Sequence, residues 1–292
     1  MKMETMKKKI TLVLALVICF VPGVSSCATN PVEHIAKVRS GIAQISLVIN
    51  KKPYPIGSAF LVEGGLVTNS HVLDVNNSND IAIRFADTNP KDIANYIVIN
   101  NFEKIIARES PKSAKDYAYL KFHDSRFKNR HVFQFSDSSN ISVGEQVVFL
   151  GFPFGDPYMT SHIGYISAVY DSNNVEIIQI DGSVNGGNSG GPLLDLKTGK
   201  VVGIITKSKV GFIAREFDKL IKTLQQNQVA LEQVKGTISS KGVDPFQAIQ
   251  ASQSAMEQIA KNLKKSANVG IGYAYSSNYV RDDIIKKRAV PK

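Results

Sequence analysis

The segment VNGGNSGGPLL, residues 184–194, places four glycines around one serine, Ser189. Glycines at this density form either a flexible surface turn or a backbone bent tightly enough to present one hydroxyl. A serine hydroxyl is a poor nucleophile at neutral pH. Catalysis by Ser189 would therefore require a base within hydrogen-bond reach and a third group that orients the base.

The chain supplies one candidate for each of these two roles. Of its five histidines, only His71 ends a stretch of small and apolar residues typical of a strand, GSAFLVEGGLVTNSHVL. An isolated histidine in such a place is more often a surface residue after a hairpin. However, Asp116 heads the apolar segment DYAYLKF, where an acid can be buried beside an imidazole. His71, Asp116 and Ser189 are thus the candidate base, orienting acid and nucleophile.

These segments resemble the trypsin-like (chymotrypsin-fold) serine proteases, and within them the bacterial HtrA/Deg branch. TNSHV is similar to the family's Thr-Ala-Ala-His motif, DYAYL to its Asp-x-Ala-x-Leu motif and GNSGGP to its nucleophile motif, in the same order. VVFLGFPFG, IGYISAVY and VGIGYAYSSNYV resemble other stretches of that branch's protease domain, so the resemblance covers about residues 40–210 and 269–285. It implies that His71 is the general base, Asp116 the orienting carboxylate and Ser189 the nucleophile.

The resemblance also implies an oxyanion hole in the backbone of Gly187, Asn188 and Ser189, which would stabilise a tetrahedral intermediate. Ser70 replaces the usual alanine before His71, and two residues near Ser189 also depart from expected patterns. Gly186 stands where the HtrA branch usually has proline, so we expect a looser loop in which the oxyanion hole need not be preformed. Asn188 replaces the aspartate that pairs with a freed N-terminus in trypsin, as is usual in the HtrA branch.

A specificity pocket is expected at Ser183, Thr206 and Lys207. Ser183 aligns with the pocket floor, where trypsin has its aspartate, so a preference for Lys or Arg side chains is not implied. We expect small or medium apolar substrate side chains, with acidic ones as an alternative because of Lys207.

Segments rich in Val, Ile, Phe and Tyr recur between residues 40 and 210, and several alternate apolar and polar residues. This spacing is typical of a β-barrel or β-sandwich. Together with the resemblance, it predicts a mainly β fold: two six-stranded antiparallel β-barrels, an inserted α-helical hairpin and a C-terminal helix. We expect the first barrel at 39–135, the first part of the second at 136–210, and its last strand with the terminal helix at 269–292.

Residues 211–268 change to a helical period. Apolar residues such as Phe217 and Leu224, and later Met256 and Ile259, recur at helical spacing and predict an antiparallel hairpin of two helices within 212–265. In the family, a loop beside the specificity pocket occupies this position. The insertion is therefore expected to cap the substrate cleft, bind a protein partner or pair with a second copy. A spacer packed on the barrel is the remaining alternative.

The N-terminus resembles an export signal. A basic start precedes a 12-residue apolar run, Ile10–Val21, which suits a secretory signal and is short for a membrane span. VSSC, which ends at Cys27, resembles a bacterial lipobox, and cleavage after Ala28 is the alternative. We expect a lipoprotein signal peptide at 1–26, a tether at 27–38, and a lipid on Cys27 that holds the exported protein at the periplasmic or cell-surface side of a bacterial membrane.

Composition argues against several other classes of function. The formal net charge is +10, but the basic residues are scattered and lack interleaved aromatics, so no nucleic-acid partner is expected. The histidines are isolated from one another and from cysteines, and no phosphate-binding glycine loop follows a strand, so we expect no metal and no cofactor. Because 17 residues follow Tyr275, we expect no peptide-binding PDZ domain.

The sequence therefore predicts an exported serine endopeptidase that hydrolyses peptide bonds. The resemblance implies unfolded or exported polypeptides as its substrates. A rival interpretation stays open, in which the chain is a non-catalytic, protease-like scaffold that acts as a chaperone or adaptor through the helical hairpin.

Overall fold

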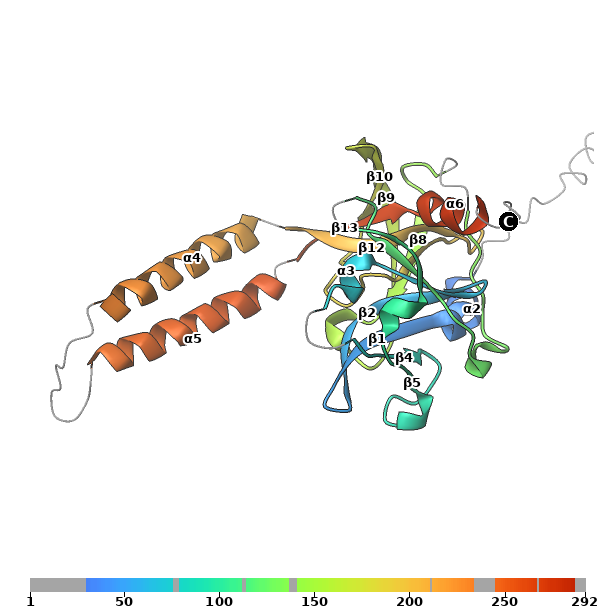
Figure 1. Cartoon of the computed structure of the whole chain (residues 1–292). Helices are drawn as coiled ribbons and strands as arrows, with labels where there is room; N and C mark the ends of the chain where they lie inside the picture. Colours follow the sequence, from blue (N-terminus) through green and yellow to red (C-terminus); the bar gives the residue numbers. More distant parts are fainter. Residues whose placement is uncertain are drawn as a thin grey trace, which may run out of the picture. The chain divides into compact units, whose positions relative to one another are not determined.

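The computed structural model describes residues 30–75, 79–111, 114–136, 141–210, 212–233, 245–266 and 268–286. Two β-rich parts carry the fold (Figure 1). The first is an antiparallel sheet of seven strands. In spatial order its strands are β5 (Ile97–Ile99), β4 (Ile81–Phe85), β1 (Ile42–Ile49), β2 (Lys52–Val62), β3 (Gly65–Thr68), β7 (Tyr117–Lys121) and β6 (Ile106–Ser110).

The second β-rich part is a closed antiparallel barrel of six strands. In ring order its strands are β10 (Val175–Asp181), β13 (Asn268–Ser276), β12 (Val201–Val210), β11 (Pro192–Asp195), β8 (Gln146–Gly151) and β9 (Thr160–Ser172). Strand β13 follows the helical hairpin in sequence and pairs with both β12 and β10, so it closes the ring across the insertion.

The predicted mainly β, chymotrypsin-like fold is confirmed, with one difference of detail. The first sheet has seven strands, and its edges are β5 and β6. β5 is three residues long and pairs with β4 alone, whereas β6 pairs with β7 alone. β6 has the sequence IARES, in which apolar alternation is weak and no residue is fully buried, so a periodicity argument passes over it.

Apolar side chains fill three interiors. One cluster lies within the first sheet and a second within the barrel, around Ile83 and Phe149 respectively. The third joins the two parts, because it contains Phe60 from β2 together with Leu150 from β8 and Leu194 from β11. Each of these residues is no more than 1% exposed, and burial of this extent is the main force that holds the two parts together.

Three further helices are short: α2 (Pro31–Val38), α3 (Ser70–Leu73) and α6 (Asn278–Lys286). α2 falls within the expected tether, and its Val38 is buried against the shared cluster. α6 follows β13 directly, and its Val280 joins the same cluster. No described helix combines the length and the apolarity that a membrane crossing requires.

The hairpin consists of α4 (Phe212–Gln233) and α5 (Pro245–Ser266), which pack against each other. Leu224 and Ala260 are buried at their contact, where half-buried polar side chains such as Gln228, Gln253 and Glu257 accompany them. The seam between the helices is thus poorer in apolar residues than the helical spacing alone suggests.

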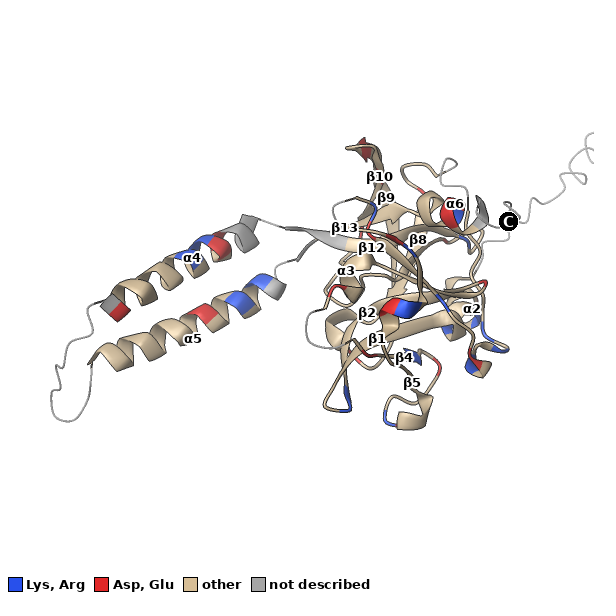
Figure 2. Cartoon of the chain, viewed as in Figure 1, with Lys and Arg blue, Asp and Glu red and all other residues tan. Residues whose placement is uncertain are grey.

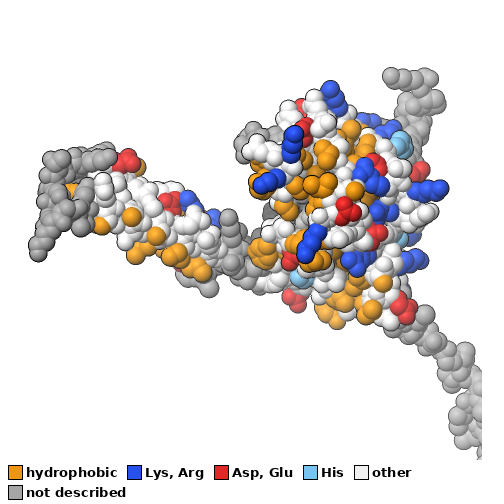
Figure 3. All heavy atoms as spheres, turned by 90° about the horizontal axis from the view of Figure 1, so that it is seen from below, with side chains coloured by type: hydrophobic (Ala, Val, Ile, Leu, Met, Phe, Trp, Pro, Cys, Tyr) orange, Lys and Arg blue, Asp and Glu red, His pale blue; other side chains and the backbone are white. Residues whose placement is uncertain are grey.

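Six apolar side chains of the described hairpin residues, Val229 among them, are instead between 44% and 58% exposed. The other five form what we call the apolar face: Leu220, Ile249, Met256, Ile259 and Leu263. Figure 3 shows a row of hydrophobic side chains along one side of the hairpin. Polar contacts lie elsewhere on the hairpin, where Gln225 donates to Glu257 at 2.8 Å and Lys264 pairs with Asp218 at 2.5 Å.

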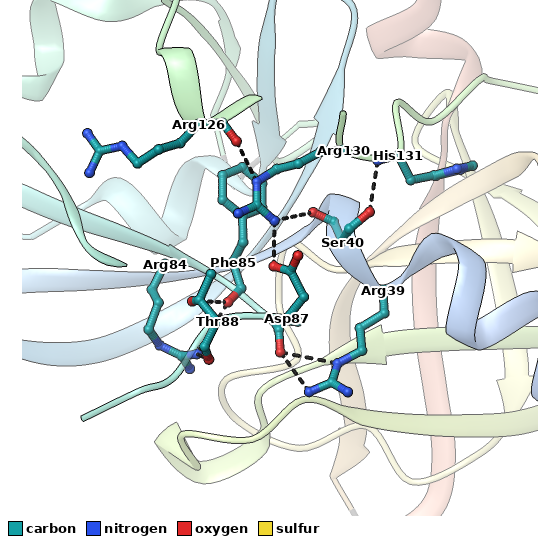
Figure 4. A network of polar contacts seen from close by, with 10 residues as sticks. Arg39, Ser40, Arg84, Phe85, Asp87, Thr88, Arg126, Arg130 and His131 are labelled. Atoms are coloured by element: carbon teal, nitrogen blue, oxygen red, sulfur yellow. Dashed lines mark hydrogen bonds and ion pairs between the residues drawn. The ribbon is translucent and has the colours of Figure 1, made fainter. Parts of the chain in front are cut away.

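Arginines donate to backbone carbonyls after β4 and in the turn before β1. Arg39 donates to the carbonyl of Ala86 at 2.9 and 3.2 Å, and Arg130 donates to that of Ser40 at 3.1 Å while it pairs with Asp87 (Figure 4). The Arg130 guanidinium also lies 4.0 Å from the centre of the Phe85 ring.

Arg84, in β4, is 1% exposed, and no carboxylate pairs with it within the described ranges. Its guanidinium donates to the carbonyl of Pro157, in the second part, at 2.5 Å and to Gln44 Oε1 at 3.2 Å. It also donates to the carbonyls of Phe85 and Thr88. Burial lowers the pKa of Arg84 from its ordinary value, so the carbonyl acceptors are what keep this buried cation tolerable.

We expect Arg84→Ala to lower the free energy of unfolding by about 3 kcal/mol or more, because it deletes a fully buried side chain and removes the donor that Arg84 gives to the Pro157 carbonyl and to Gln44 Oε1. Urea unfolding followed by far-UV circular dichroism measures the change. The matched control is Arg126→Ala, since Arg126 is part-exposed and pairs with Asp124 at the surface. It should cost less than about 1 kcal/mol. Equal losses in the two variants would contradict the structural role of Arg84.

Candidate active site

His71 lies in α3, directly after β3, with 23% of its side chain exposed. Its Nδ1 lies 2.8 Å from Asp116 Oδ2, and its backbone N–H donates to Asp116 Oδ1 at 3.1 Å. Because an ionised carboxylate can only accept, we assign the proton of a neutral ring to Nδ1. In this tautomer Nε2 is an acceptor with no partner among the described hydrogen bonds, which is what a general base requires.

Asp116 precedes β7, and only 1% of its side chain is exposed. Its backbone has φ of +46°, a left-handed conformation that is uncommon for a residue other than glycine. The Asn69 amide holds this conformation by donating to the Asp116 carbonyl at 2.7 Å, and Thr206 Oγ1 donates to Asp116 Oδ2 at 2.7 Å. Backbone strain that neighbouring groups hold in place is a feature of functional sites.

Ser189 lies in the loop between β10 and β11, and its Oγ donates to the carbonyl of Thr206 at 3.0 Å. Thr206 therefore contacts both Asp116, through its hydroxyl, and Ser189, through its carbonyl. The structure thus brings His71, Asp116 and Ser189 to one place. No hydrogen bond joins Ser189 to His71 among the described contacts, and in enzymes without substrate such a bond is often long or unformed.

At two positions of the loop around Ser189, the backbone has a conformation that favours glycine. Gly187 has φ of +98° and Gly190 has φ of +86°. A Cβ at Gly187 would lie 2.2 Å from the carbonyl oxygen of Phe152. Among the described hydrogen bonds, the N–H groups of Gly187 and Ser189 have no protein acceptor, so both are available to an oxygen outside the protein.

Gly186 and Asn188 are the two residues near Ser189 that depart from expected patterns. The carbonyl of Gly186 accepts from the N–H of Phe154 at 2.5 Å, and a Cβ on Gly186 would meet nothing within 4 Å. Asn188 is fully buried, and its side-chain oxygen and nitrogen have no hydrogen-bond partner in the described part of the chain. An uncharged amide is the cheaper group to bury here, because an unpaired carboxylate would cost more free energy.

The three expected pocket residues have different surroundings. Ser183 is exposed in the turn after β10. Thr206 is 7% exposed, with its hydroxyl on Asp116, and the side chain of Lys207 lies outside the described residues. Cys27 also lies outside them.

A cavity of about 1060 Å³ opens beside His71 on the side of the first sheet. Its lining includes the carboxylates of Asp74, Glu103 and Glu109, and Ser70 Oγ donates to Glu109 at 2.6 Å. In the part of the chain that the structure describes, no group of three or more His, Cys, Asp or Glu side chains is arranged to hold a metal ion.

Sequence reasoning missed two residues of the site and one contact. Asn69 and Ser58 lie within the stretch that leads to His71. Their residue types do not indicate that Asn69 donates to the Asp116 carbonyl or that Ser58 donates to the Gly187 carbonyl. Thr206 was expected only in the pocket, and its contact with Asp116 joins residues 90 positions apart. The only signal that the sequence offers for this contact is a hydroxyl within a strand of apolar residues.

Comparison with known proteins agrees with this geometry. The trypsin-like peptidase domain matches residues 57–204. The chain is 36% identical over 190 residues to the probable periplasmic serine endoprotease DegP-like of Rickettsia prowazekii (strain Madrid E), which covers 60% of this chain and 34% of that protein. It is 35% identical over 164 residues to the protein of the same name from Rickettsia conorii, covering 53% and 29%. The matched region thus spans about a third of these relatives.

Two solved structures share the fold. The HtrA-type protease AlgW with tripeptide superposes with a TM-score of 0.55 at 20% identity, covering 88% of this chain and 64% of that one. An inactive form of Rv3671c from M. tuberculosis H37Rv gives a TM-score of 0.52 at 15% identity, covering 92% and 96%. The domain match covers half of the chain and includes His71, Asp116 and Ser189. The chain therefore belongs to the family of trypsin-like peptidase domains.

Proposed function

We propose that the chain is an exported serine endopeptidase. The observation that carries the proposal is the continuous path from the His71 imidazole through the Asp116 carboxylate and Thr206 to the Ser189 hydroxyl, with contacts of 2.7 to 3.0 Å. A binding scaffold has no physical need for a buried carboxylate that fixes the tautomer of an imidazole. The names of the relatives, as periplasmic serine endoproteases, support the same function.

In the proposed mechanism, rotation about the Cα–Cβ bond of Ser189 moves its hydroxyl from the Thr206 carbonyl to His71. His71 Nε2 takes the hydroxyl proton as Oγ attacks a peptide carbonyl, and Asp116 stabilises the resulting imidazolium. The N–H groups of Gly187 and Ser189 then bind the oxyanion. His71 returns the proton to the leaving amine. Water, deprotonated by the same base, then attacks the acyl group, and His71 passes this proton to Ser189 Oγ as the bond between Oγ and the acyl carbon breaks.

We propose unfolded or exported polypeptides as substrates, because the relatives are named as periplasmic enzymes. We also propose that residues 1–26 are removed on export and that a lipid on Cys27 anchors the mature chain to a bacterial membrane. This anchor depends on the sequence VSSC alone.

The apolar face of the hairpin supports a protein–protein interface, and we propose a second copy of the chain as its partner. Charged residues are absent from 223–231 and 245–256, so among the described residues in the half of α4 and α5 farthest from the barrel only Glu232 is charged (Figure 2). Depletion of charge is the compositional signal of interface cores. Uncharged helix faces rich in amides and small residues suit packing against other helices.

The size of the face fits a dimer. Two helices of 22 residues, side by side, present a face about 33 Å long and about 20 Å wide, or roughly 660 Å². Two copies would bury about 1,300 Å², which lies within the range of specific interfaces. Such a dimer would be a four-helix bundle, which supplies the core that Leu224 and Ala260 alone do not give the hairpin.

We expect the wild-type chain to cleave fluorescently labelled casein and to react with a fluorophosphonate, and Ser189→Ala to lose both. The casein rate should fall by at least about 1000-fold, because the nucleophile is removed. Ser167→Ala is the matched control, since it changes a serine of β9 outside the site and should keep both reactions. Equal rates in wild type and Ser189→Ala, or no reaction in either, would favour the scaffold interpretation.

We expect Cys27→Ser to move the protein from washed membranes to the soluble fraction of a Gram-negative host, because a lipid chain adds about 0.8 kcal/mol of membrane affinity per buried CH₂. Ser25→Ala keeps a small residue in the same motif and should leave the protein on the membrane. Membrane association that persists in Cys27→Ser would argue against the lipid anchor.

We expect the Cys27→Ser chain to sediment as a dimer and the addition of Met256→Glu with Ile259→Glu to make it a monomer, since two carboxylates would be buried without partners. Sedimentation equilibrium gives the masses. Gln226→Glu with Gln258→Glu adds the same charge at exposed positions off the apolar face and should remain dimeric. A monomeric parent chain would reject the dimer and leave packing within one copy, or another partner, as the use of this face.

A further inference from the structure

Ser58 is a fully buried serine of β2 whose polar groups all point toward the candidate active site or its supports. Its N–H donates to the carbonyl of Ser189 at 2.8 Å, and its own carbonyl accepts from Thr68 Oγ1 at 2.7 Å. Its hydroxyl donates to the carbonyl of Gly187 at 2.7 Å and accepts from the N–H of Phe152 at 3.0 Å. One residue of the first sheet thus contacts two segments of the second barrel.

These contacts belong to a series that orients the loop containing Ser189. The four consecutive carbonyls of residues 186–189 each accept one hydrogen bond. The donors, in order, are Phe154 N, Ser58 Oγ, Gly191 N and Ser58 N, at 2.5, 2.7, 3.0 and 2.8 Å. In this series only the donor to Gly187 is a side chain, so it is the one that a substitution can remove.

The direction of the two proposed oxyanion donors follows from the same series. In a trans peptide, the N–H points opposite to the carbonyl of the preceding residue. Holding the carbonyls of Gly186 and Asn188 therefore aims the N–H groups of Gly187 and Ser189. The peptide between these two planes carries the Gly187 carbonyl, and Ser58 Oγ fixes it.

Glycine makes this restraint necessary. Gly187 has φ of +98°, and it follows Gly186, beside which a Cβ would meet nothing within 4 Å. Two successive glycines have a wide range of accessible backbone angles, so the loop loses much entropy when it is ordered. Ser58 Oγ also holds Phe152 N, and Phe152 begins the turn that carries Phe154 N to Gly186. The Ser58 hydroxyl thus restrains the peptide planes that contain the N–H groups of Gly187 and Ser189.

We propose that Ser58 is a positioning residue for the oxyanion hole, whose hydroxyl holds the Gly187 carbonyl and the Phe152 amide so that the N–H groups of Gly187 and Ser189 converge before substrate arrives. This inference rests on the proposed peptidase function. Ser58 touches no reacting atom through its side chain, and it acts through the loop.

The test compares Ser58→Ala with Ser277→Ala. Both serines are fully buried, and Ser277 Oγ likewise donates to a carbonyl, that of Val201, at 2.9 Å. Initial rates over a range of labelled-casein concentrations give the apparent kcat and KM. Ser58→Ala should lower kcat by about 10- to 100-fold with KM little changed, because oxyanion binding occurs in the transition state. Ser277→Ala should keep both constants.

A second measurement is the rate of fluorophosphonate labelling, since the phosphonyl oxygen takes the oxyanion position. Labelling should slow by a similar factor in Ser58→Ala and be unchanged in Ser277→Ala. Where Ser58→Ala fails to fold, Ser58→Cys decides the outcome, because its thiol has nearly the same shape but donates weakly. Its labelling rate should also fall by at least about tenfold.

These measurements distinguish failure of the positioning role from failure of the peptidase function. Wild-type kcat and labelling in Ser58→Ala, or in Ser58→Cys where the alanine variant does not fold, would overturn the positioning role while leaving the peptidase function intact. A wild-type chain that neither cleaves casein nor reacts with the fluorophosphonate would instead reject the peptidase function, and the positioning role with it.

Discussion

The buried carboxylate of Asp116 is the interaction on which the rest of the site depends. Removing a carboxylate from water costs several kcal/mol unless its oxygens accept hydrogen bonds. Three donors meet it here: the backbone N–H and Nδ1 of His71, and Oγ1 of Thr206. The first two come from the segment after β3 and the third from β12, so the carboxylate is fully satisfied only where the sheet and the barrel meet.

The loop that contains Ser189 also depends on hydrogen bonds formed where the sheet and the barrel meet. Its glycines have no side chains that can be buried, so its order must come from hydrogen bonds to its backbone. Ser58 in the first sheet supplies two of them, and Phe154 in the second barrel supplies another. The nucleophile loop is therefore held at the same junction that satisfies Asp116. Packing of Phe60 against Leu150 and Leu194 keeps that junction closed.

Local motifs were enough to predict the fold class and to select His71, Asp116 and Ser189 as candidates, because each motif combines a strand end with one chemically distinctive residue. In the structure His71 contacts Asp116, and Thr206 contacts both Asp116 and Ser189. Contacts that join distant segments were not predictable. The hydroxyls of Ser58 and Thr206 look like any others in a strand, and their partners lie 129 and 90 residues away. Helical spacing identified α4 and α5, but it assigned the apolar residues of α5 to a stripe without saying that Ala260, not Met256, would face α4.

The hydrogen bond from Ser189 Oγ to the Thr206 carbonyl is compatible with the proposed chemistry. The free energy of this bond is small compared with that of one oxyanion donor. Breaking one hydrogen bond between a hydroxyl and a carbonyl costs about 1 kcal/mol, and a new bond to His71 Nε2 offsets most of it. One oxyanion donor contributes about 3 kcal/mol to lowering the barrier. The orientation of the Gly187 and Ser189 amides therefore affects the rate more than the resting rotamer of the nucleophile does. This difference in free energy fits the distribution of contacts: several hydrogen bonds fix the loop backbone, whereas one hydrogen bond, to the Thr206 carbonyl, holds the Ser189 hydroxyl.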